Sequence, residues 1–143
     1  MISKLKFYLS LIIARCAYIG IRLLNKSSGT SFVGMLVLKI CPDFLKYCSK
    51  YIKKRIITIT GTNGKSTTSG LIAHILETAH QKVVHNLKGA NMLTGVANVF
   101  ALSIAPLKRY DYAVIESDEA YLTKLYDYMK SDYLVVTNLF RDQ

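Results

Sequence analysis

The stretch "TITGTNGKSTTSG", residues 58–70, decides how this sequence folds. It overlaps a run of mainly β-branched residues, "RIITIT", residues 55–60, which predicts a buried strand. Strand, glycine-rich turn and helix form the context in which a loop binds phosphate. The spacing is unusual, because only Thr62 and Asn63 separate Gly61 from Gly64, where the common Walker A loop has four residues before its Gly-Lys pair.

The residue types in this loop suit a nucleotide. A helix N-terminus offers free N–H groups and partial positive charge to phosphate. Gly61 and Gly64 let the backbone approach closely, because they carry no Cβ. Lys65 can reach the terminal phosphates, and Ser66, with Thr67 as second choice, offers a hydroxyl to Mg²⁺. The competing interpretation is a tight turn that binds nothing.

Downstream of the loop, helical and strand patterns alternate. We expect helices at residues 71–81, 96–105 and 118–130. We expect strands at 82–86, 110–116 and 132–138, and a loop at 87–95. This alternation predicts a parallel α/β sheet with flanking helices. Asp118 is expected to cap the last helix.

Glu116 ends an apolar strand, "YAVIE", and is therefore expected at the carboxyl edge of the sheet. Ligands bind at that edge in open α/β sheets. A carboxylate there can hold the Mg²⁺ that bridges nucleotide phosphates. The plainer alternative is that Glu116 is a helix cap.

The basic residues are unevenly distributed along the chain. The net charge is +10, and Met1–Arg55 contains 11 Lys and Arg but a single acid, Asp43. From residue 56 onward, 8 basic residues balance 8 acidic ones. We therefore expect two parts, a basic helical segment at 1–54 and a nucleotide-binding domain at 55–143, with further helical pieces at 32–40 and 41–54. No interleaved aromatic-basic motif indicates nucleic-acid binding.

The first 26 residues predict an amphipathic helix with a wide apolar face. Lys4, Arg15, Arg22 and Lys26 fall in a narrow basic stripe. The uninterrupted apolar run is too short to span a bilayer. The helix can pack against the rest of the protein, which the pattern favours, or lie in a membrane interface.

The cysteines give a weaker signal. Cys16, Cys41 and Cys48 are odd in number and lack CxxC spacing, so we expect no disulfide framework and a reducing, cytoplasmic compartment. The histidines add no paired metal-ligand motif.

The segment "GTNGKST" resembles the shortened ATP loop of the Mur ligase family and its relatives, including folylpolyglutamate synthase. Three further stretches, "HNLKGANMLTGVA", "YAVIESDEAYL" and "DYLVVTNLFRDQ", resemble the branch of that family that amidates lipid II. The amino-acid-adding members usually have Asp-His where this chain has Asp142-Gln143. The resemblance runs from about Gly29 to the last residue.

The resemblance implies an enzyme that uses ATP and Mg²⁺ to activate a carboxylate as an acyl phosphate, which an amine then displaces. It implies catalytic roles for Lys65, on the β- and γ-phosphates, and for Glu116. The implied Mg²⁺ ligands are Ser66 and Glu116. The positions implied to bind the nucleotide are Gly61, Thr62, Asn63, Gly64, Lys65, Ser66, Thr67 and Asn138. Lys88, Asn91 and Met92 are implied near the muramyl-peptide side, and the alternative for them is an ordinary loop.

By the same resemblance, the acceptor is the D-glutamate α-carboxylate of lipid II, and ammonia comes from a separate glutaminase subunit of the GatD type. The expected location is the cytoplasm, at the inner face of the membrane. The central domain of the family is longer than the part present here, so we expect this chain to be the N-terminal part of a longer protein, with a four-cysteine zinc site downstream, or the product of a truncated gene. The alternatives are another amino-acid ligase of the family, or a nucleotide-binding fragment without activity.

Overall fold

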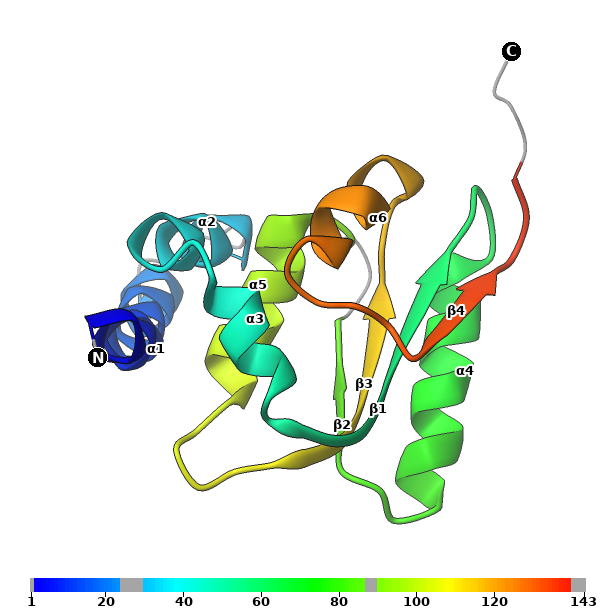
Figure 1. The fold of residues 1–143 in the computed structure, drawn as a ribbon, viewed down its shortest axis with the longest axis horizontal. Helices are drawn as coiled ribbons and strands as arrows, with labels where there is room; N and C mark the ends of the chain where they lie inside the picture. The colour runs from blue at the N-terminus through cyan, green and yellow to red at the C-terminus, as the bar shows by residue number, and fades with distance from the viewer. Residues whose placement is uncertain (1, 24–29, 87–89, 140–143) are drawn as a thin grey trace.

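The computed structural model of the protein describes residues 2–23, 30–86 and 90–139 (Figure 1). Three helices come first, α1 (Ile2–Leu23), α2 (Thr30–Ile40) and α3 (Phe44–Ser49). Strands and helices then alternate, as β1 (Ile52–Thr60), α4 (Lys65–Thr78), β2 (Val83–His85), α5 (Leu93–Ser103), β3 (Tyr110–Glu116), α6 (Glu119–Tyr126) and β4 (Tyr133–Val136).

The four strands form one parallel sheet with the order β2-β3-β1-β4. This confirms the predicted α/β class. The central strand β1 pairs with β3, where Ile59 lies opposite Glu116, and with β4, where Thr60 lies opposite Val136. Because all pairs are parallel, the carboxyl ends of the strands share one edge, the upper edge in Figure 1.

Several element boundaries differ from those expected. Helix α4 begins at Lys65 rather than at residue 71, and α5 begins at Leu93 rather than at 96. The predicted helix at 41–54 ends at Ser49, and β1 starts at Ile52, which pairs with Tyr110. Helix α6 ends at Tyr126, four residues before the expected end. In contrast, the prediction for β3 is confirmed at both ends.

Helices cover both faces of the sheet. Helix α4 packs on one face around a small core of Ile59, Ala73 and Val114. On the other face α5 lies against the sheet, with α3 beside it, and α1 and α2 pack outside α5 (Figure 1). A second, larger apolar core extends from the sheet through α5 to α1.

The packing alternative for the first helix is confirmed. Phe7 lies 5.2 Å from Phe44, 5.5 Å from Tyr47 and 5.7 Å from Tyr51, measured between ring centroids. Aromatic pairs at such spacings add to the stability that apolar burial gives. The N-terminal helices therefore share a core with the sheet, whereas the division between residues 54 and 55 stays a prediction. Lys26 lies outside the described residues.

Helices α2 and α5 approach each other closely at Gly34. A Cβ built on Gly34 would come 1.7 Å from the carbonyl oxygen of Thr94. This contact cannot be relieved by rotating a side chain, because the opposing atom belongs to the backbone of α5. Gly34 therefore sets the distance between the two helices.

We predict that Gly34→Ala lowers the free energy of unfolding by about 2 kcal/mol, because the added methyl forces the helices apart. The matched control is Gly20→Ala in α1, where a Cβ would meet nothing within 4 Å. That substitution should raise the free energy of unfolding by roughly 0.5–1 kcal/mol, since alanine favours helix. Urea unfolding of both variants measures the difference, and equal effects would contradict this account of the interface.

Candidate nucleotide site

The loop between β1 and α4 is built on two glycines with left-handed backbone angles. Gly61 has φ of 131° and Gly64 has φ of 82°, a region in which only glycine is free of strain. Gly64 is the N-cap of α4 and, having no side chain, leaves the first turn uncapped. The first i→i−4 bond of the helix is donated by the Thr68 N–H to the Gly64 carbonyl, 2.9 Å. The N–H groups of Lys65, Ser66 and Thr67 come before this bond and therefore have no carbonyl acceptor within α4.

The residues after β4 hold this loop from the side. The Thr62 N–H donates to the Asn138 carbonyl at 3.0 Å, and the Asn63 N–H donates to Asn138 Oδ1 at 2.9 Å. Thr137 Oγ1 donates to the Asn63 carbonyl at 2.6 Å. A Cβ on Gly61 would come 2.3 Å from Thr137 Oγ1 and 2.6 Å from the Asn138 carbonyl oxygen. Gly61 is therefore required by its neighbours as well as by its backbone angle.

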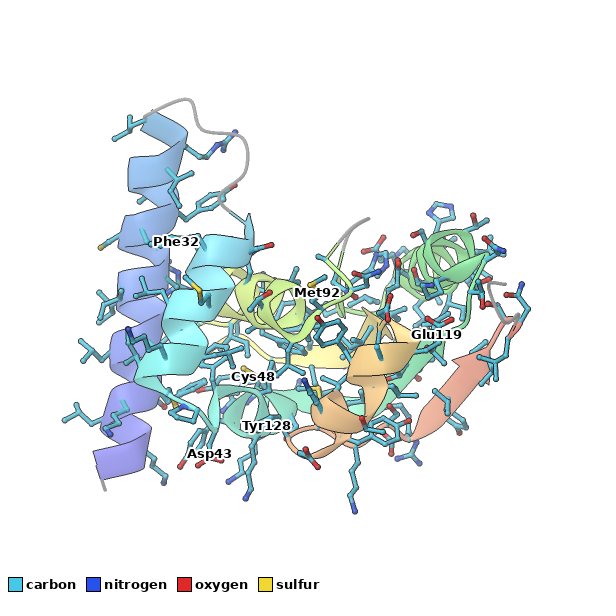
Figure 2. All side chains as sticks on the ribbon, turned by 90° about the horizontal axis from the view of Figure 1, so that it is seen from above. Phe32, Asp43, Cys48, Met92, Glu119 and Tyr128 are labelled. Atoms are coloured by element: carbon cyan, nitrogen blue, oxygen red, sulfur yellow. The ribbon has the colours of Figure 1, made fainter. Side chains whose placement is uncertain are left out.

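Lys65 folds back over the loop it follows. Its Nζ donates to the carbonyl oxygens of Gly61 and Thr62. The same nitrogen lies 3.7 Å from Glu119 Oε2 on α6, and the Lys65 side chain is only 12% exposed. The ammonium of Lys65 therefore lies between the loop carbonyls and the negatively charged Glu119 carboxylate. Figure 2 looks onto this edge, with Glu119 labelled.

Glu116 lies at the end of the adjacent strand and is 3% exposed. Its backbone is fixed by Asn86, whose Oδ1 accepts from the Glu116 N–H at 2.7 Å and whose Nδ2 donates to the Glu116 carbonyl at 2.8 Å. Asn86 Nδ2 also donates to the Ala90 carbonyl at 2.8 Å, and the amide is fully buried. One side chain therefore positions the end of β3 and the segment before α5.

The site fits Mg²⁺ and a phosphorylated ligand. Within the described part of the chain, Glu116 Oε2 is buried without a hydrogen-bond partner. A buried carboxylate oxygen without a partner is costly, and a hard divalent cation is a ligand that satisfies it. The same edge offers free N–H groups from the first turn of α4 and the Lys65 ammonium, which suit phosphate oxygens.

The other predicted positions are only partly described. Asn91 lies next to the site, because its carbonyl accepts from the Asp118 N–H at 3.1 Å. Met92 is the N-cap of α5 and is half exposed (Figure 2). Lys88 lies outside the described residues. Asp118 caps α6, accepting from the Ala120 N–H at 3.0 Å, which confirms the capping prediction.

Four residues at this edge were not singled out from sequence. Asn86 and Thr137 are polar residues at or just after strand ends, which was an available signal, since the carboxyl ends of parallel strands meet. Glu119 follows a capping residue, and an acidic residue in the first turn of a helix is common enough to give no sign of a binding role. His85 lies one residue before Asn86, and its Nε2 is 3.3 Å from Ser69 Oγ on α4.

The fold and this edge together define a parallel α/β domain with a glycine loop at the carboxyl ends of its strands. Residues 59–142 match the Mur ligase middle domain family. The chain belongs to the Mur ligase family.

The sequence is similar to curated members of this family. Over 140 residues it is 35% identical to subunit MurT of the glutamine-hydrolysing lipid II isoglutaminyl synthase of Streptococcus pneumoniae, matching 98% of this chain and 30% of that protein. It is 36% identical over 115 residues to MurT of Staphylococcus aureus strain COL, matching 80% and 26%. With the UDP-N-acetylmuramoylalanine–D-glutamate ligase of Bacteroides fragilis strain ATCC 25285 it shares 31% identity over 98 residues, or 68% and 20% of the two chains. The chain thus spans less than a third of each relative.

A solved structure agrees on the fold. The UDP-N-acetylmuramoylalanyl-D-glutamyl-2,6-diaminopimelate–D-alanyl-D-alanyl ligase of Acinetobacter baumannii superposes with a TM-score of 0.55 and 20% identity. The match covers 71% of this chain and 22% of that one. At this identity the likeness supports the fold alone. The resemblance drawn from the sequence motifs is therefore confirmed at the level of family and fold.

We predict that Asn86→Ala lowers the free energy of unfolding by about 3 kcal/mol, because it removes two buried hydrogen bonds and one partly buried one and leaves backbone groups of Glu116 unpaired. The matched control is Asn91→Ala, whose neighbouring contact uses only its backbone carbonyl and should cost about 0.5 kcal/mol or less. Chemical denaturation measures both. Similar losses for the two variants would show that the Asn86 amide does not hold the end of β3.

Stability should also depend on His85. Burial lowers the pKa of this imidazole below its usual 6.5, although the Glu116 and Glu77 carboxylates act in the opposite direction. Because the unfolded chain then binds more protons, the free energy of unfolding should fall as the pH drops below about 6.5. Denaturation at pH 7.5 and 5.5 tests this, with His85→Gln expected to reduce the loss and the exposed His74→Gln expected to keep it. An unchanged pH response in His85→Gln would contradict the assignment.

Proposed function

We propose that this chain is the nucleotide-binding part of an ATP- and Mg²⁺-dependent amide ligase of peptidoglycan synthesis. The proposed reaction amidates the D-glutamate α-carboxylate of lipid II to D-isoglutamine through an acyl phosphate. The observation that carries the nucleotide site is the unpaired, buried Glu116 Oε2, one strand away from the glycine loop. Neither a tight turn nor a helix cap accounts for that oxygen, since a cap would pair it with a helix N–H.

Each proposed role follows from a contact at the sheet edge. The N–H groups at the start of α4 would bind phosphate oxygens, and Lys65 would turn from the loop carbonyls towards the terminal phosphates. Asn138 would position the loop beside the nucleotide, because it accepts hydrogen bonds from the N–H groups of Thr62 and Asn63.

Ser66 and Glu116 would hold Mg²⁺, which, when bound, offsets the charge that gathers on the phosphoryl group. Asn86 contributes by holding the Glu116 backbone in place. Thr62, Asn63 and Thr67 would complete the wall of the phosphate site.

The choice of acceptor rests on the similarity to MurT. That similarity extends over 98% of this chain, compared with 68% for the D-glutamate ligase. We therefore propose lipid II as the substrate, a glutaminase of the GatD type as the ammonia-supplying partner, and the inner face of the cytoplasmic membrane as the location. Asn91 and Met92 are proposed to face the muramyl peptide, because Asn91 contacts the backbone of Asp118 at this edge and Met92 starts α5. The zinc site of the resemblance would belong to sequence beyond Gln143.

Calorimetry with MgATP tests the nucleotide site. We expect the chain to bind MgATP and Lys65→Ala to bind it about tenfold more weakly or worse, because a charge-assisted hydrogen bond to phosphate is lost. The matched control is Lys130→Ala, an exposed lysine outside this edge, which should bind like the unchanged chain. Glu119→Gln should bind at least as tightly as the unchanged chain, since it releases Lys65 from its ion pair.

Two results would overturn the proposal. Equal affinities for the Lys65 and Lys130 variants, both folded by circular dichroism, would refute the phosphate role of the loop. If MgATP binds as expected but the full-length ligase turns over ATP with a free amino acid instead of with ammonia and lipid II, the nucleotide site stands and the acceptor is wrong.

A further inference from the structure

Helix α1 carries two apolar stripes on roughly opposite sides. The inner stripe belongs to the core, and its residues Phe7, Leu11 and Ala14 are at most 2% exposed. The outer stripe repeats at alternating spacings of four and three residues. Its members are Leu5, Leu9, Ile12, Cys16, Ile19 and Leu23. We call these six residues the outer stripe.

The outer stripe is exposed along almost the whole helix. Leu5 is 70% exposed, Ile12 60% and Leu23 81%. A helix that packs on a core through one face is ordinarily polar on the other. Figure 2 shows α1 at the end of the molecule, with side chains along its outer side projecting away from the rest of the protein. A continuous apolar stripe of this kind marks an interaction surface rather than scattered exposed residues.

The charges beside the outer stripe are all positive. Lys4 and Arg22 are exposed on one side of it and Lys6 on the other. The sequence has no Asp or Glu from Met1 to Pro42. Arg15 belongs to the same basic arc but is turned to the core, where its guanidinium donates to the Ile104 carbonyl. An apolar stripe bordered by lysine and arginine is complementary to a surface that is apolar inside and anionic at its rim.

We propose that the outer stripe of α1 docks on an anionic lipid bilayer, with the helix lying in the plane of the interface. The leucine and isoleucine side chains enter the acyl boundary, and Lys4, Lys6 and Arg22 meet lipid phosphates. The helix does not need to span the bilayer, because its inner face is committed to the core. Among the described residues, none of the helices is both long enough and apolar enough to cross a membrane.

A second copy of the chain is a less suitable occupant. Alternating spacings of four and three also suit helix pairing. However, two outer stripes packed together would bring Lys4, Lys6 and Arg22 of both copies close, with no acidic residue on either helix to neutralise them. Like charges at such an interface oppose association. The docking surface does not rest on the proposed ligase function, because every step concerns α1 alone.

Vesicle flotation of the 143-residue chain tests the docking surface. We expect the chain to float with vesicles of equal phosphatidylglycerol and phosphatidylcholine, and to float less in high salt, which screens the lysines and arginine. The variant Leu9→Gln/Ile12→Gln/Ile19→Gln should bind these vesicles about tenfold more weakly or worse, since three apolar contacts are lost. The matched control is Leu71→Gln/Ile75→Gln/Leu107→Gln, which changes three apolar residues elsewhere that are at least as exposed as Leu9 and should float like the unchanged chain.

A fluorescent reporter locates the contact, because the chain contains no tryptophan. In Ile12→Trp the emission should shift to shorter wavelength when the same vesicles are added, as the indole leaves water. In Leu71→Trp, on α4, it should not shift. Pure phosphatidylcholine vesicles should give a smaller shift than the anionic ones.

Three results would overturn the inference. These are failure of the folded chain to float with the anionic vesicles, equal flotation of the two triple variants, or a reporter shift in Leu71→Trp alone. A light-scattering mass of a dimer that only the outer-stripe variant abolishes, without vesicle binding by the unchanged chain, would assign the stripe to a second copy instead. Calorimetry with MgATP on the outer-stripe variant distinguishes failure of the docking surface from failure of the ligase proposal. The affinity of this variant for MgATP should equal that of the unchanged chain.

Discussion

The close contact between Gly61 and the end of β4 is the constraint on which the rest of this edge depends. Thr137 and Asn138 occupy the space that a side chain at Gly61 would need. They also hold the loop by hydrogen bonds, because Asn138 accepts from the Thr62 and Asn63 N–H groups and Thr137 donates to the Asn63 carbonyl. Because β4 pairs with β1 directly before the loop, the sheet itself determines where α4 can begin. The start of α4 then fixes the direction of the N–H groups and of Lys65.

A second constraint on the site lies at the end of β3, which pairs with the side of β1 opposite to β4. Asn86 directly follows β2 and bonds both backbone groups of Glu116, so the end of β3 is held in place from the neighbouring strand. Burial of the Glu116 carboxylate without a partner is unfavourable in the isolated domain. Such an arrangement is typical of a site whose missing partner is a ligand, and it links the packing of the sheet to the proposed chemistry.

Local sequence signals were sufficient for the fold class, for the glycine loop and for the position of Glu116 at the end of β3. Asn138 was singled out only by the family resemblance, and the roles of Glu116 and Asn138 towards a nucleotide stay predictions. The β3 pattern "YDYAVIE" is uniform enough to predict both ends of the strand. The start of α4 was placed too late, because Lys65 to Gly70 is rich in Ser, Thr and Gly, which favour turns when tertiary contacts are ignored. The start of β1 was missed because Lys53 and Lys54 continue a basic, helix-like run. The contacts that tie Asn86 to Glu116 and Glu119 to Lys65 join residues about 30 and 54 positions apart, which no local pattern can reveal.

The most direct measurement for the central claim is a crystal structure of the chain with Mg²⁺ and a non-hydrolysable ATP analogue. Our account predicts the β- and γ-phosphates against the N–H groups of residues 64–67, Lys65 withdrawn from Glu119, and Mg²⁺ coordinated at Ser66 and reached by the Glu116 carboxylate directly or through water. An analogue bound elsewhere, or bound at the loop while Glu116 stays buried and distant from the metal, would contradict it.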